Sequence, residues 1–111
     1  MMNHPDEPSV QWRLAFAITN VLSLNPIGRK TFGERSIVLL LASAKRFPND
    51  KRLQLWTCRA LHQLIMKNKK NRDAALASDG INIVLETQKL HKSEKDIFSA
   101  AEKVIDMLWE F

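Results

Sequence analysis

The sequence predicts an all-α protein made of one helical unit that occurs more than once. Three observations lead to this prediction: apolar residues recur at helical spacing, the pattern returns after 43 and 44 residues, and no stretch alternates apolar and polar residues as a strand does. The chain has 111 residues, of which 45% are hydrophobic and 26% charged, so it is long enough to form one domain with a buried core.

The first support is a helical stripe that occurs three times. Each copy has residues at i, i+4, i+7, i+8 and i+11, which share one face of a helix, and all but one of these residues are apolar. The stripes begin 43 and then 44 residues apart and consist of Val10, Leu14, Ala17, Ile18 and Val21; of Leu53, Thr57, Ala60, Leu61 and Leu64; and of Ile97, Ala101, Val104, Ile105 and Leu108.

The segments between the stripes repeat as well. A second amphipathic helix is predicted before each of the last two stripes, with shorter helices at about 27–33 and 72–78 that end in turns at Gly33 and Gly80. Asp50 and the Ser93–Asp96 capping box predict where the two following helices begin. The apolar positions of the second helices, again 44 residues apart, are Ile37, Leu40, Leu41 and Ala44, and then Ile81, Val84, Leu85 and Gln88.

Three segments carry a resemblance to a known family. Residues 77–87 resemble the place where a short armadillo helix ends at a glycine and an apolar helix starts, 53–65 resemble the third helix, and 45–50 resemble the linker between repeats. The chain is thus similar to the armadillo-like (ARM/HEAT) superfamily, with repeats of the kind found in β-catenin and importin-α. The resemblance implies a short right-handed α-solenoid of about two to two and a half repeats over residues 9–111, with third helices near 9–24, 51–66 and 94–110. We expect residues 1–8, which have no helical pattern, to form a mobile leader.

The same resemblance implies a binding site. In armadillo proteins the third helices line a concave groove that holds an extended peptide, with an aromatic or basic residue followed four positions later by an Asn that bonds the peptide backbone. Asn20 matches the Asn position, Gln63 is a longer amide, and Met107 departs from the pattern. Because two of the residues are basic, the implied partner is an acidic extended protein segment. The candidate concave-face residues are Phe16, Asn20, Arg59, Gln63, Lys103 and Met107.

A second candidate site follows from the charge. The net charge is +5, yet residues 29–72 carry twelve basic and two acidic residues. The densest group, Lys67, Lys69, Lys70 and Arg72, is predicted to be a solvated loop between helices, the alternative being a loop that binds an anion such as the phosphates of a nucleic acid. The apolar ending, which contains Trp109 and Phe111, leaves a third interpretation open: self-association, or stacking within a longer repeat protein.

Other function classes find little support in the residues. A single cysteine gives no internal disulfide, and the longest apolar run is six residues, so we expect no membrane span and a cytoplasmic location, with the nucleus as the alternative. Cys58 and His62 share a helix face, but two ligands do not make a metal site, and we expect the cysteine to be a packing residue. No phosphate-binding glycine loop or nucleophile motif occurs, so neither a catalytic site, a metal nor a cofactor is expected, and an enzyme is not predicted.

Overall fold

The computed structural model describes residues 13, 17, 27–66 and 68–109, and these residues form helices joined by short turns. The predicted all-α class is confirmed for this part of the chain. The leader at 1–8 and most of the helix expected at 9–24 lie outside the described residues. The helices are α2 (Ile27–Arg46), α3 (Lys51–Ile65), α4 (Lys69–Ala77), α5 (Gly80–Leu90) and α6 (Lys95–Trp109).

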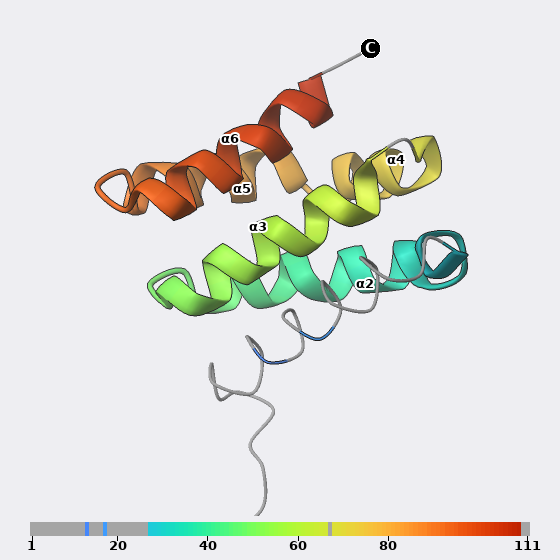
Figure 1. Cartoon of the computed structure of the whole chain (residues 1–111), viewed down its shortest axis with the longest axis horizontal. Coiled ribbons are helices and arrows are strands. Elements are labelled where there is room, and N and C mark those ends of the chain that lie inside the picture. Colours follow the sequence, from blue (N-terminus) through green and yellow to red (C-terminus); the bar gives the residue numbers. More distant parts are fainter. Residues whose placement is uncertain (1–12, 14–16, 18–26, 67, 110–111) are drawn as a thin grey trace, which may run out of the picture.

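The helices form two pairs that lie against each other (Figure 1). The first pair consists of α2 and α3, the second pair consists of α5 and α6, and the short α4 connects them. The helix bounds repeat: α6 begins 44 residues after α3 (95 against 51) and ends 44 residues after it (109 against 65). The end of α5 likewise follows the end of α2 by 44 residues (90 against 46). The predicted period is therefore present in the helix bounds.

The turn predicted at Gly33 is wrong, because α2 continues through this residue as one 20-residue helix. Gly33 has another role in the structure. A Cβ atom added here would collide with the side chain of Asn71, whose Nδ2 donates to the carbonyl oxygen of Leu64 at 2.7 Å. The glycine lets α4 approach α2 closely. The sequence pattern alone does not distinguish a glycine with this role from a glycine that ends a helix.

Asn68 explains why the basic cluster is not a loop. Its Oδ1 accepts a hydrogen bond from the backbone N–H of Asn71 at 3.0 Å, and α4 therefore begins at Lys69. The short helix predicted at about 72–78 exists, but it starts three residues earlier. The prediction of a 67–72 loop is thus wrong for Lys69, Lys70 and Arg72, which lie in the first turns of α4.

The other predicted boundaries are met in part. Asp50 caps α3 as expected, since its Oδ1 accepts from the N–H of Leu53 at 2.9 Å. Helix α6 begins one residue later than the Ser93 cap implies, because the Glu94 carbonyl accepts the first helical bond, from the N–H of Phe98. Helix α5 begins at Gly80 after Asp79, whose φ of 63° makes the turn. A Cβ at Gly80 would lie 2.6 Å from the carbonyl oxygen of Ala75, so a glycine is required there.

The core lies between the two pairs and is made of the predicted stripes. All ten residues of the second and third stripes are buried, Thr57 included. Apolar residues of α2, α4 and α5 complete it, and Trp56 packs against it from the side. Burial of this many large aliphatic side chains, each worth about 1.5–3 kcal/mol, is the main source of stability.

Two polar contacts fix the position of the pairs relative to each other. The buried amide of Gln54 donates through Nε2 to the carbonyl oxygens of Ala44 and Phe47, at 3.1 and 3.0 Å. Its Oε1 lies 2.7 Å from the hydroxyl of Thr87 on α5, which donates to it. His91 Nε2 donates to the Pro48 carbonyl oxygen at 2.8 Å and joins the two turns. The Gln54 bonds connect α2, α3 and α5, the His91 bond adds a second contact between the pairs, and together they give the packing a single register.

Candidate binding groove

One hollow of about 260 Å³ lies between α3 and α6. It is called the α3–α6 groove below, and its lining consists of Cys58, Arg59, His62, Gln63, Asp96, Ser99, Ala100 and Lys103. Three residues predicted for the concave face, Arg59, Gln63 and Lys103, come together here. The structure thus places side chains from two helices, 44 residues apart in sequence, around one open space.

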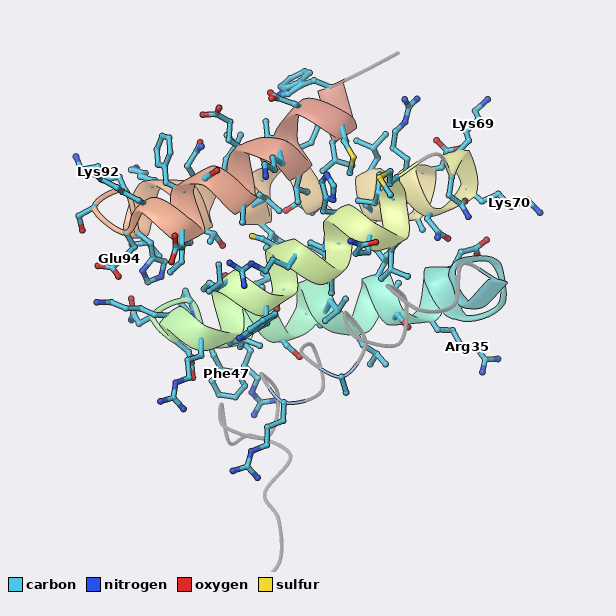
Figure 2. The ribbon with its side chains drawn as sticks, in the orientation of Figure 1. Arg35, Phe47, Lys69, Lys70, Lys92 and Glu94 are labelled. Atoms are coloured by element: carbon cyan, nitrogen blue, oxygen red, sulfur yellow. The ribbon has the colours of Figure 1, made fainter. Side chains whose placement is uncertain are left out.

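Helical spacing explains the convergence. On α3 the residues Arg59 and Gln63 are one turn apart, and on α6 the residues Asp96, Ser99 and Lys103 follow at i, i+3 and i+7. The apolar stripes of both helices turn into the core, so this neighbouring face of each helix remains at the surface. The side chains are drawn in Figure 2, where α3 runs beneath α6.

Arg59 is exposed but held in place. Its guanidinium carbon lies 4.8 Å from the centre of the Trp56 ring, in the position of a cation–π contact. Trp56 in turn packs against the core. A guanidinium supported in this way keeps its planar donors available for a carboxylate while losing less conformational entropy on binding.

The charges of the groove are unequal along its length. Arg59 and Lys103 contribute two positive charges, and Asp96, in the first turn of α6, contributes a negative one. The positive end of the α6 dipole favours a carboxylate at that position even without a partner. The side of the groove near Arg59 and Lys103 is therefore the side suited to an anionic group.

Cys58 forms a neutral, unreactive part of the groove lining. It is 2% exposed, and burial raises the pKa of its thiol to about 12. A thiol that stays protonated at neutral pH is a poor nucleophile and a poor metal ligand. No group of three or more His, Cys, Asp or Glu residues that could hold a metal ion occurs in the described part of the chain.

The remaining predicted residues have other positions. Met107 is half-buried and packs against the core, so it lies outside the groove lining. Phe16, Asn20 and Lys67 lie outside the described residues. Sequence reasoning missed Asp96 and Ser99, although their spacing to Lys103 along one helix face was a signal that could have identified them.

The basic residues of α4 lie apart from the groove. Lys69 and Lys70 are exposed and point outward at the α4 end of the molecule (Figure 2). Arg72 is half-buried on the same short helix. None of these three residues lines the α3–α6 groove, so the two predicted sites lie on different surfaces.

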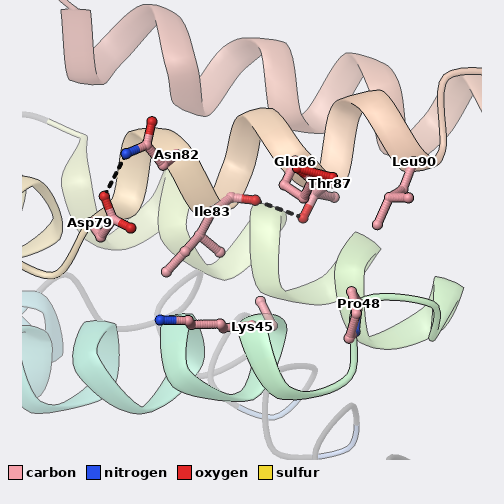
Figure 3. A pocket seen from close by; sticks show the side chains of 9 residues that line it. Lys45, Pro48, Asp79, Asn82, Ile83, Glu86, Thr87 and Leu90 are labelled. Carbon is pink, nitrogen blue, oxygen red and sulfur yellow. Dashed lines mark hydrogen bonds between the residues drawn. The ribbon is translucent and has the colours of Figure 1, made fainter.

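A second hollow, of about 330 Å³, lies between α2 and α5 (Figure 3). Its polar side chains are largely paired already: Asn82 Nδ2 donates to Asp79 Oδ1 at 2.7 Å, and the Thr87 hydroxyl lies within reach of both Gln54 and the Ile83 carbonyl oxygen. What remains is an apolar wall with Lys45 and Glu86 at its edge. The α3–α6 groove has more polar and charged side chains in its lining and is the stronger candidate.

Comparisons with known proteins identify no relative. No family model matches the chain, and neither the curated proteins nor the solved structures contain a significant match. Within the described residues, none of the helices has both the length and the apolar character needed to cross a membrane.

Proposed function

We propose that this chain is a non-catalytic protein-binding module that holds an extended, acidic segment of a partner protein along the α3–α6 groove. The observation that carries the proposal is the convergence of Arg59, Gln63 and Lys103 on one open hollow. Helix bounds that repeat after 44 residues support an armadillo-like solenoid of about two repeats as the underlying fold. In such a fold, consecutive third helices present matching side chains to one ligand.

Each groove residue has a role in the proposal. The Arg59 guanidinium, supported by Trp56, forms a bidentate pair with a carboxylate of the partner. Lys103 binds a second carboxylate further along the groove. The Gln63 amide both donates and accepts, so it suits the main chain of an extended segment. Asp96 repels acidic side chains at its end of the groove and thereby sets the direction in which the segment lies.

A nucleic acid is the alternative partner, bound through phosphates by Lys67, Lys69, Lys70 and Arg72. The positions of Lys69 and Lys70 make this alternative separable by experiment, because they are exposed on α4 rather than at the groove. A purely structural role, without a groove ligand, is the third alternative. The same set of variants distinguishes all three.

The test is a titration of the full chain against two labelled probes, followed by fluorescence anisotropy. One probe is a Glu-rich peptide of about a dozen residues, and its control is the same peptide with Gln in place of Glu. The other probe is a single-stranded oligonucleotide. We expect the acidic peptide to bind and the Gln peptide to bind at least about tenfold more weakly, because the carboxylates supply the recognition.

The variant Arg59→Glu/Lys103→Glu tests the groove, and Lys69→Glu/Lys70→Glu is its matched control, with the same change in net charge. The proposal predicts that the groove variant loses about tenfold or more in peptide affinity, whereas the α4 variant stays within about threefold. If the α4 variant loses oligonucleotide binding and neither variant affects the peptide, the nucleic-acid function replaces the proposal. If wild type binds neither probe, the structural role remains.

A further inference from the structure

The second pair has an exposed apolar surface on the side that faces away from the first pair. Among the described residues no helix lies against this side (Figure 1). We call it the end face, and it consists of Leu85 and Gln88 on α5 and of Phe98, Glu102 and Trp109 on α6. Leu85, Phe98 and Trp109 are 39%, 37% and 55% exposed.

The 44-residue register shows what kind of surface this is. The residues of the first pair at the corresponding positions are Leu41, Gln54 and Ile65, which are 1%, 0% and 3% exposed. They are buried because the second pair and α4 cover them. The end face is thus the counterpart of an internal packing surface, with larger apolar residues, Phe98 and Trp109, in place of Gln54 and Ile65. A surface of this kind on a soluble protein is typical of an interface.

The charges along α6 indicate which partner covers the end face. On the side of α6 that carries Phe98 and Trp109, the exposed base Lys95 lies in the first turn and the exposed acids Glu102 and Asp106 lie in the second half, whereas the groove side has the opposite order, Asp96 before Lys103. A second α6 running in the opposite direction would place the bases of each helix beside the acids of the other.

We propose that the end face binds a second copy of this chain and forms a twofold-symmetric dimer in which the two α6 helices pack antiparallel. A twofold axis requires a surface that is complementary to itself. The end face meets this requirement: its apolar stripe runs along α6 and its charge changes sign along the same helix. In the dimer Lys95 of one copy lies near Asp106 of the other, and Phe98 and Trp109 are covered.

The apolar part of the proposed interface lies apart from the groove. The groove residues of α6, Asp96, Ser99 and Lys103, lie on a different side of the helix from Phe98, Glu102 and Trp109, since successive residues turn by about 100°. A dimer therefore presents two grooves, and a partner with two acidic segments would bind by avidity. The dimer proposal does not depend on the groove function.

Sedimentation velocity of the full chain, from about 1 µM to about 1 mM, tests the proposal. We expect wild type to pass from monomer to dimer and to stop at two copies. The variants Phe98→Glu and Trp109→Glu place a charge in the interface and stay monomeric over the range. Leu39→Glu is the matched control: Leu39 is 58% exposed on α2, so this variant has a similar change at another surface and dimerises as wild type does.

Charge exchange tests the antiparallel arrangement. Lys95→Asp alone and Asp106→Lys alone each weaken the dimer by about tenfold, and the double variant recovers to within about threefold of wild type, because both pairs form again with reversed sign. A wild type that stays monomeric at about 1 mM overturns the proposal. A mass that rises beyond two copies also overturns it, and so does a Leu39→Glu variant that stays monomeric. Either result indicates head-to-tail association through α2.

Discussion

The two helix pairs repeat after 44 residues, and α3 and α6 have 15 residues each, but the pairs differ in what surrounds them. In the first pair, Leu41 and Ile65 are core residues, whereas Leu85 and Trp109 at the corresponding places in the second pair are exposed. The local sequence pattern is apolar in both. An apolar position in a repeated helix therefore becomes part of the core only where a neighbouring pair covers it.

The polar residues show the same difference. Gln54 is fully buried in the first pair and satisfies two carbonyl groups there, whereas Phe98 takes its place in the second pair at the surface. Cys58 is buried, and its counterpart Glu102 is exposed. For each difference, we expect a substitution at the buried position to lower the free energy of unfolding more than a substitution at an exposed position of the second pair.

The largest expected difference is between two leucine truncations. Leu41→Ala removes a buried side chain and leaves a cavity, so we expect the free energy of unfolding to fall by about 3 kcal/mol. Leu85→Ala removes a side chain that is already partly in water, and its cost stays below about 1 kcal/mol. Urea denaturation at low protein concentration measures both. Equal losses would contradict the assignment of the end face as uncovered.

The next effect concerns the buried amide. Gln54→Leu leaves the carbonyl groups of Ala44 and Phe47 and the hydroxyl of Thr87 without their partner, at a cost of about 2 kcal/mol. Gln88→Leu is the control, because the Gln88 Nε2 contact with the Phe98 carbonyl oxygen is exposed and 3.5 Å long. We expect it to change stability by less than about 0.5 kcal/mol in the same denaturation experiment.

A similar effect depends on pH. The pKa of Cys58 is about 12 in the folded chain against 9.0 for the free group, so above pH 9 the unfolded state loses a proton that the folded state keeps. The contribution of this thiol to the free energy of unfolding is constant below pH 9 and falls above it, by about 2 kcal/mol between pH 8 and 10.5. The measurement is the difference in pH slope between wild type and Cys58→Ala.

The matched control moves the thiol to the corresponding exposed position. The variant Cys58→Ala/Glu102→Cys has a solvated thiol in the second pair, and we expect its pH slope to equal that of Cys58→Ala. The same thiol should react at once with a thiol reagent at neutral pH, while Cys58 in wild type reacts slowly. A rapid reaction of wild type would contradict the burial of Cys58.

The smallest effect expected is at Gly33. Replacing a helical glycine by alanine ordinarily stabilises a helix by about 1 kcal/mol. Gly33→Ala instead destabilises by about 1 kcal/mol, because the added methyl group displaces the Asn71 side chain from its bond to Leu64. A stabilised Gly33→Ala, measured by thermal unfolding, would show that α4 and α2 are further apart than described.

The sequence allowed the all-α class, the two described stripes and the 44-residue spacing to be predicted, because helical burial leaves a periodic signal. The cap at Asp50 has an equally local cause. Gly33 could not be assigned correctly, since its role is contact with Asn71, 38 residues away in the chain. The groove residues Asp96 and Ser99 were missed because the family pattern contains one pair of residues per helix, whereas further side chains of α3 and α6 line the hollow.

The most direct test of the comparison follows the environment of Trp109. In a chain with Trp12→Phe and Trp56→Phe, Trp109 is the only tryptophan, and its emission reports whether the end face is covered. We expect solvent-exposed emission in dilute protein, a blue shift as the concentration rises, and no shift when Phe98→Glu is added. Blue-shifted emission at every concentration, unchanged by Phe98→Glu, would contradict it.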